Sequence, residues 1–222
     1  MAGGLPLESA MHRRALLAAL ALGSLATPSL AAKAPVEYAG ADGGYVAYAV
    51  GTITLGMHFD FPYRRVAQPD GAPVNDWTGT IEPKLGGAIY LKIKNPDFTG
   101  RETGQIVVRR LPPGDYLIEN FAFYGSSPLG ASYDWSAAKP FAIRFSIQPG
   151  KATYIGSYMR APSMGTSLAP QLGSVGFFVV ADRSERDLPI VRTRLSLAVE
   201  VLSHVTDVEP FGNALLRSRE PD

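Results

Sequence analysis

Two stretches of this chain join β-rich runs through a Pro-Gly pair, and they limit its fold more than any other feature. Gln105–Tyr124 alternates apolar and polar residues on both sides of Pro113–Gly114, and Phe141–Tyr158 repeats the arrangement around Pro149–Gly150. Pro followed by Gly suits the two central positions of a type II turn, because Gly accepts the positive φ of the second position. Both stretches therefore predict a strand, a tight turn and a second strand, that is, two β-hairpins.

Other runs carry the same strand signals. Met57–Phe61 alternates between apolar and polar residues, and Val175–Val180 is entirely apolar, which is typical of a fully buried strand. Tyr45–Leu55 is nearly as apolar and contains Gly51, where we expect a bend or a bulge. Gly (23) and Pro (18) are abundant, as many short strands with many turns require. We predict an all-β fold, an antiparallel β-sandwich of about seven or eight strands.

The pattern changes after the buried run. Asp182–Glu185 and Ser184–Asp187 both resemble helix-start boxes, and Pro189 is typical of a first helical turn. We therefore expect a short C-terminal helix that ends at about Leu195, with the acidic residues acting as caps and not as calcium ligands. The sequence after Asp207 is polar and charged and predicts a loose tail.

The N-terminal sequence is typical of an export signal. Ala15–Leu25 is an apolar run preceded by basic residues, and it is shorter than the roughly 20 residues that span a bilayer. We expect the signal to start at Met11 and to be cleaved after Ala31. Arg13–Arg14 resembles a twin-arginine signal, but His12 precedes it in place of Ser or Thr, so the general secretory route is favoured.

These signals predict four parts: a signal peptide over 1–31, a leader arm over 32–43, a β-sandwich domain over 44–205 and a polar tail over 206–222. The chain contains 46% hydrophobic and 18% charged residues, which is typical of a globular domain. Its formal net charge of +1 argues against nucleic acid as a partner. The absence of cysteine excludes disulfides, thiolate metal sites and cysteine nucleophiles. The expected location is periplasmic or secreted.

Motifs for catalysis are absent or lack their context. His58 and His204 are the histidines that remain after signal cleavage, and they form no zinc motif. His58 and Asp60 share one face of a strand, which we interpret as a solvated polar face in preference to a metal or proton-relay pair. Ser136–Lys139 matches S-x-x-K without a downstream K-T-G, and no nucleophile elbow or Gly-rich phosphate motif occurs. We expect no catalytic residue, metal or cofactor.

Large aromatic residues in loop-like sequence are the candidate ligand-binding residues: Trp77, Tyr133 and Trp135, with Phe98 as a weaker fourth. Loops gather at the ends of a sandwich, where binding sites form. Flat rings there stack on a sugar ring or anchor a protein partner. The alternative is that these rings fold back and cover the open ends of the core.

A family resemblance rests on the two turns. Leu111–Tyr116, LPPGDY, resembles the strand-turn-strand element of prealbumin-like and carboxypeptidase-regulatory-like sandwich modules. Ile147–Gly156, IQPGKATYIG, is similar to the matching element in uncharacterised bacterial envelope proteins of that kind. The resemblance covers roughly residues 85–181. It implies a non-catalytic binding or scaffolding unit with no shared catalytic residues, and the long loops after Val66 and Gly125 depart from the module.

The sequence therefore favours an exported, soluble β-sandwich that acts as a binding or assembly module in the bacterial cell envelope. The expected partner is an envelope protein or a carbohydrate, and the oligomeric state is left open. Two alternatives stand beside it. One is a hydrolase of envelope polymers that uses an unrecognised carboxylate site. The other is a structural partner that pairs an exposed edge strand with another protein.

Overall fold

The computed structural model describes residues 37–53, 58–69, 71, 77–86, 92–126, 132–137, 139–161, 176–196 and 198–219, all within the unit Val36–Asp222. Strands dominate these residues, together with one α-helix and one short 3-10 helix. The all-β class is therefore confirmed. No helix in the described ranges is long and apolar enough to cross a membrane. The expected signal peptide, residues 1–31, lies outside the described residues and stays a prediction.

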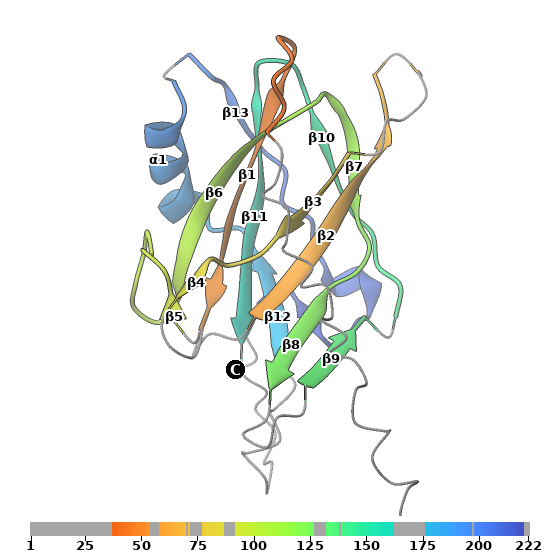
Figure 1. The fold of residues 1–222 in the computed structure, drawn as a ribbon, viewed down its shortest axis with the longest axis vertical. Coiled ribbons are helices and arrows are strands. Elements are labelled where there is room, and N and C mark those ends of the chain that lie inside the picture. The colour runs from red at the N-terminus through yellow and green to blue at the C-terminus, as the bar shows by residue number, and fades with distance from the viewer. Residues whose placement is uncertain are drawn as a thin grey trace, which may run out of the picture. The chain divides into compact units, whose positions relative to one another are not determined.

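The first sheet is built around β1 (Gly44–Thr52), which pairs in parallel with β11 (Ala152–Ala161) and antiparallel with β6 (Thr103–Leu111). Its order is β14-β12-β11-β1-β6, and β13 also pairs with β11 (Figure 1). The other members are β12 (Phe177–Ala181), β13 (Val201–Ser203) and β14 (Leu216–Arg217). The helix α1 (Ser184–Arg194) packs on the outer face. Burial of β1 on both faces explains its nearly continuous apolar sequence.

The pairing of β1 with β11 contains a bulge on β11. Its register steps from Tyr154 to Ser157, and Gly156 lies within the step with a φ of +105°. Glycine adopts this conformation without a steric penalty. The bulge predicted as one possibility at Gly51 was wrong, because that residue stays in register with both neighbouring strands. Gly51 instead allows the backbones of β1 and β6 to lie close together, since a Cβ there would lie 2.2 Å from the carbonyl oxygen of Thr103.

The second sheet has the order β10-β7-β2-β8-β9, with β3 also pairing β2. Its central strand β2 (His58–Ala67) alternates as predicted, with Phe59 and Phe61 buried and His58 exposed. The other members are β3 (Thr78–Ile81), β7 (Gly114–Ile118), β8 (Ala122–Ser126), β9 (Ser132–Ser136) and β10 (Ile143–Ile147). A separate pair of short strands, β4 (Leu85–Gly86) and β5 (Lys92–Ile93), lies between β3 and β6 in the chain. The fourteen strands of the described residues exceed the expected seven or eight.

The inner faces of the two sheets meet in an aromatic core. Phe178 of the first sheet stacks on Phe123 of the second, with ring centroids 4.3 Å apart. Phe61 of the second sheet contacts both Phe178 and Tyr158, at 4.4 and 5.2 Å. All four side chains are almost completely buried. Burial of such large rings supplies most of the favourable free energy that holds the sheets together.

Both Pro-Gly turns join one sheet to the other. β6 pairs with β1, whereas β7 pairs with β2 and β10, and no pairing between β6 and β7 occurs among the described strands. The second turn likewise leads from β10 in the second sheet to β11 in the first. The two predicted hairpins were therefore wrong, although the strands on either side were right. Gly114 and Gly150 do have positive φ, +144° and +68°. A tight turn reverses the chain, but distant strands decide where its two arms pair.

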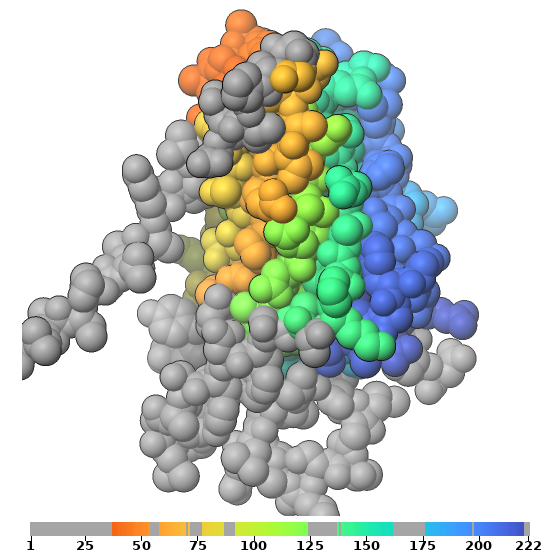
Figure 2. All heavy atoms as spheres, turned by 90° about the vertical axis from the view of Figure 1, so that its right-hand side faces the viewer, coloured from red at the N-terminus to blue at the C-terminus, as the bar shows by residue number. Residues whose placement is uncertain are grey.

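The segment after the buried run differs from prediction in two ways. α1 begins at Ser184, whose N–H donates to Asp182 Oδ1 at 2.8 Å, so Pro189 lies inside the helix and not in its first turn. The prediction of a loose tail after Asp207 is also wrong. Val208 and Leu216 are buried in the inner core, because β14 pairs with β12. Figure 2 shows this blue C-terminal part of the chain lying beside the second sheet.

Candidate functional site

β6 is an edge strand of the first sheet, and a loop covers part of its outer edge. The Ile106 N–H donates to Asp97 Oδ2 at 2.7 Å, and the Gly104 N–H donates to the Phe98 carbonyl at 3.1 Å. The Arg194 guanidinium, at the end of α1, donates to the Ile106 carbonyl. These contacts occupy the backbone groups that an exposed edge strand would otherwise offer to another chain.

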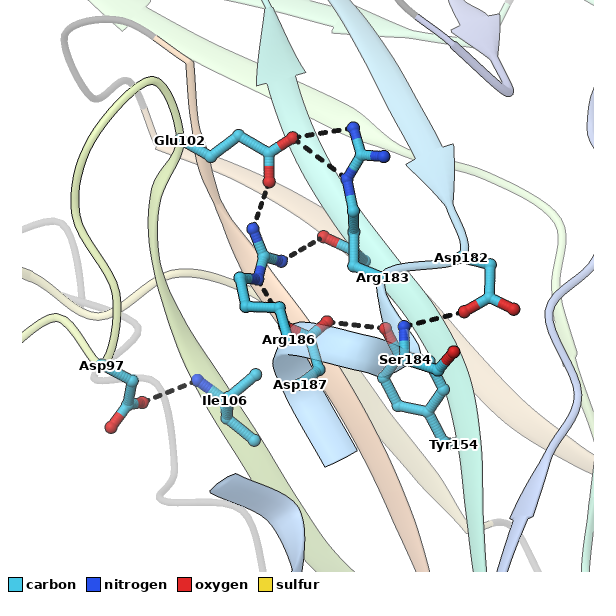
Figure 3. A network of polar contacts seen from close by, with 10 residues as sticks. Asp97, Glu102, Ile106, Tyr154, Asp182, Arg183, Ser184, Arg186 and Asp187 are labelled. Carbon is cyan, nitrogen blue, oxygen red and sulfur yellow. Dashed lines mark hydrogen bonds and ion pairs between the residues drawn. The ribbon is translucent and has the colours of Figure 1, made fainter. Parts of the chain in front are cut away.

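A buried ionic network fixes α1 against the sheet (Figure 3). Asp187 is completely buried, and its carboxylate accepts hydrogen bonds from the Tyr154 hydroxyl and from Arg186 Nε, both at 2.6 Å. Burial raises the pKa of Tyr154, and the neighbouring Asp187 charge raises it further. A buried carboxylate is tolerated only with such partners.

Arg186 extends this network to the loop before β6. Its guanidinium pairs with Glu102, donates to the Ser157 hydroxyl at 3.2 Å and lies 3.7 Å from the centroid of the Phe98 ring. Burial alone would lower the pKa of Arg186, but its contacts with Asp187 and Glu102 outweigh this effect and raise it. Each of these groups is already engaged, so the network positions α1 and offers no spare group for proton transfer.

A cavity of about 310 Å³ lies at the edge of β6, beside this clamped helix. It is bounded by the β4–β5 pair, the loop after β5, the middle of β6 and the last residue of α1. The lining residues are Lys84, Lys94, Asn95, Asp97, Gln105, Ile106, Val107 and Arg194. Its volume is at the lower end of the range for small-molecule sites.

Gln105 holds the cavity wall in place. Its side chain is nearly buried, accepts a hydrogen bond from the Lys84 N–H at 3.0 Å and donates one to the Lys94 carbonyl. The Lys94 N–H also donates to the Lys84 carbonyl at 2.8 Å. Leu85 pairs with Ile93, so this bond continues the antiparallel register by one step and sets Lys84 opposite Lys94. Opposite residues in an antiparallel pair project from the same face.

The charges of the lining do not balance. Lys84, Lys94 and Arg194 are positive and Asp97 is negative, which leaves two positive charges over. Asp97 is committed to Arg194, with Oδ1 and Nη2 2.5 Å apart. Neither lysine contacts a carboxylate within the described ranges, and residues 87–91, between the two strands, include no acidic residue. Like charges on opposite residues destabilise a strand pair, so an anion between the lysines would remove a repulsion.

The structure separates the predicted aromatic residues that it describes. Trp77 is partly buried against the inner core, and its ring meets Tyr38 edge to face at 5.7 Å. Phe98 is partly buried against the outer face of the first sheet, beneath Arg186. The two rings thus belong to different hydrophobic clusters, and their role in ligand binding stays a prediction.

Tyr133 and Trp135 lie on β9, in sequence that was predicted to be a loop. The register of β8 and β9 sets Trp135 opposite Phe123 and Tyr133 opposite Gly125. The loop prediction was therefore wrong at these positions, because the alternating pattern of β9 is short and interrupted by polar residues. The side chains of both residues lie outside the described part of the structure, so their role in binding stays a prediction.

Neither His58 nor Asp60 lines the cavity beside β6. His58 Nε2 lies 3.6 Å from Glu82 Oε2, which lowers the pKa of Glu82. This pair lies partly exposed at the end of β2. No group of three or more His, Cys, Asp or Glu side chains suited to a metal comes together in the part of the chain that the structure describes.

Sequence reasoning missed the cavity at β6. The available signal was that Lys84 and Lys94 directly flank residues 85–93, a mostly apolar run that contains glycine. Neither a protein-family model, nor a curated protein, nor a solved structure matches the chain. The interpretation of the cavity therefore rests on its geometry and charge.

Proposed function

We propose that this protein is an exported, non-catalytic binding module of the bacterial cell envelope, with a β-sandwich architecture, and that it captures an anionic ligand at the cavity beside β6. The observation that carries the proposal is the pair Lys84 and Lys94. The two residues lie opposite each other, both are exposed, and no carboxylate among the described residues neutralises them.

The cavity wall is supported before any ligand arrives. Gln105 ties both lysine backbones to β6, and Asp97 ties α1 to the loop through Arg194. Preorganised walls reduce the entropy that binding must overcome. A wall held in this way, with two ammonium groups left over, is suited to ligand capture more than to catalysis, which would need a nucleophile or a titrating acid–base pair nearby.

Two further features support the envelope setting and the architecture. Residues 1–31 have the basic start, apolar run and small-residue cleavage pattern of an export signal. The two sheets share one aromatic core through their inner faces, as the layers of a sandwich do. The covered stretch of β6 around Ile106 counts against strand addition at that part of the edge.

The test is a binding measurement on the mature protein. Isothermal titration with a panel of small anions should show saturable, salt-sensitive binding, and neutral sugars of the same size should not compete. Lys84→Ala and Lys94→Ala should each weaken binding, whereas Lys92→Ala should not, because Lys92 lies only two residues before Lys94 but outside the cavity lining. Equal loss in all three variants, or binding that ignores them, would remove the cavity from consideration.

A further inference from the structure

We infer that the group held in this cavity is a phosphate monoester of a small uncharged molecule, and not a carboxylate. The inference rests on the proposed function, since it names the ligand class for the same cavity. It follows from the charge left unpaired, from the state of the one guanidinium in the lining and from the chemistry of the remaining wall.

The charge balance sets the first condition. Two positive charges remain after Asp97 is counted against Arg194. A phosphate monoester carries close to two negative charges at neutral pH, because its second pKa is about 6. A single carboxylate carries one. Either anion reduces the repulsion between Lys84 and Lys94, but the dianion also balances the charge of the lining, whereas a single carboxylate leaves one positive charge over.

The hydrogen bonds of the Arg194 guanidinium set the second condition on the ligand. Planar carboxylates are commonly recognised by two parallel N–H donors of one arginine. Arg194 is the arginine of this cavity, and its two terminal nitrogens are engaged, Nη1 with the Ile106 carbonyl and Nη2 with Asp97. Both terminal nitrogens of Arg194 and its charge are thus committed to protein partners. The charged lining groups that have no carboxylate partner among the described residues are the two ammonium groups, which are compact point charges without a planar preference. They suit the several oxygens of a tetrahedral group.

The rest of the wall sets the third condition. Ile106 and Val107 contribute aliphatic surface, and Asn95 contributes an exposed amide. Asp97 is the one carboxylate of the lining and is already paired. No group is left to neutralise a cation on the ligand, so the molecule esterified to the phosphate is uncharged. The cavity of about 310 Å³ accommodates the phosphate together with a small body attached to it.

The experiment compares glycerol 1-phosphate with glycerate, which keeps a similar body and exchanges phosphate for carboxylate. Calorimetry on the wild-type protein should give roughly fivefold to tenfold tighter binding of glycerol 1-phosphate. Its affinity should fall below about pH 6, where the phosphate gains a proton, while that of inorganic sulfate should stay constant over the same range. Lys84→Ala and Lys94→Ala should abolish the preference for phosphate, and Lys92→Ala should keep it.

A second arm distinguishes a free ester from a lipid headgroup. Phosphatidylcholine vesicles with and without phosphatidic acid present the same monoester on a surface. Lysine-dependent binding to the phosphatidic acid vesicles in preference to glycerol 1-phosphate would support the inference with a lipid as its source, and the reverse preference would support a soluble ester.

Failure of the phosphate inference can be distinguished from failure of the proposed function. If glycerate binds as tightly as glycerol 1-phosphate and still requires both lysines, the phosphate inference is overturned and the binding function stands. If no anion binds, or if Lys84→Ala and Lys94→Ala leave every affinity unchanged, the proposed function falls with it. Circular dichroism of the variants checks that loss of binding is not loss of fold.

Discussion

The Tyr154 hydroxyl donates a 2.6 Å hydrogen bond to the Asp187 carboxylate, and neither side chain is exposed to solvent. Tyr154 belongs to the first sheet and Asp187 to α1, so one buried polar contact joins the helix to the sheet. Arg186 completes the set with a bond to the same carboxylate. Because these groups are paired away from water, removing any one of them leaves the others without a hydrogen-bond partner.

Asp187→Ala should therefore destabilise the protein strongly. Loss of the carboxylate leaves the Arg186 charge and the Tyr154 hydroxyl without their buried partner, which should lower the free energy of unfolding by about 3–5 kcal/mol. Tyr154→Phe should cost less, about 1–3 kcal/mol, since Arg186 still compensates the carboxylate. Urea unfolding measures both. Asp182→Ala is the control at an exposed position, and an equal loss there would contradict a special role for the buried contact.

Alkaline pH should unfold the protein as buried tyrosines ionise. Burial raises the pKa of Tyr48, Tyr116, Tyr154 and Tyr158 above the ordinary value of 10.0. The resulting stability is fully present below pH 10 and is lost as pH rises past it, because the unfolded chain releases these protons first. Absorbance at 295 nm should show part of the ten tyrosines titrating only together with the loss of near-UV circular dichroism. Independent titration of all ten while the fold persists would refute this.

Trp77→Ala should lower stability, because the ring packs on the inner core and against Tyr38. The expected loss is about 1–3 kcal/mol in the free energy of unfolding, below that of a fully buried ring. Trp77→Phe keeps an aromatic ring and should recover part of the loss. Should Trp77→Ala instead weaken carbohydrate binding and leave the unfolding midpoint unchanged, the ring would be a ligand contact and not a cover of the core.

Lys84→Glu should stabilise the protein while it destroys anion binding. The change places opposite charges on a pair that now carries like charges, and should add about 0.2–1 kcal/mol to the free energy of unfolding at low salt. Lys92→Glu is the matched control, since Lys92 pairs with Gly86 and gains no such partner. Thermal unfolding at low and high ionic strength measures the stability of both variants. A destabilised Lys84→Glu protein would show that the lysine pair carries no stored repulsion.

The sequence predicted the strand content well and the connections poorly. β2 and β12 follow from local patterns, because alternation and uninterrupted apolar runs report burial on one face or on both. The Pro-Gly turns looked like hairpins because local sequence encodes the reversal of the chain. The actual pairing of β6 with β1, and of β7 with β2, depends on strands far away in the chain. The same limit hid β14, whose short polar surroundings masked the buried Leu216.

The candidate site was harder to foresee than the fold. A lysine on a strand is ordinarily a solvated residue, and nothing in the local sequence marks Lys84 or Lys94 as different. Their opposition depends on Gln105, which bridges both backbones from β6. For the aromatic residues in loop-like sequence the difficulty is the opposite, because their residue type suggests a binding site wherever they lie. Trp77 was predicted to bind a ligand because it is a large aromatic residue in loop-like sequence, and its packing on Tyr38 and on the inner core depends on residues far away in the chain.

The position of β1 has a consequence for the time course of folding. This early strand pairs directly with β11, where Tyr45 meets Ala152, and the sheet is completed by Leu216 of β14. During synthesis the first sheet cannot be completed until these late strands, β11 and β14, have left the ribosome. Contacts between residues far apart in the chain outnumber local ones, so folding is expected to be slow.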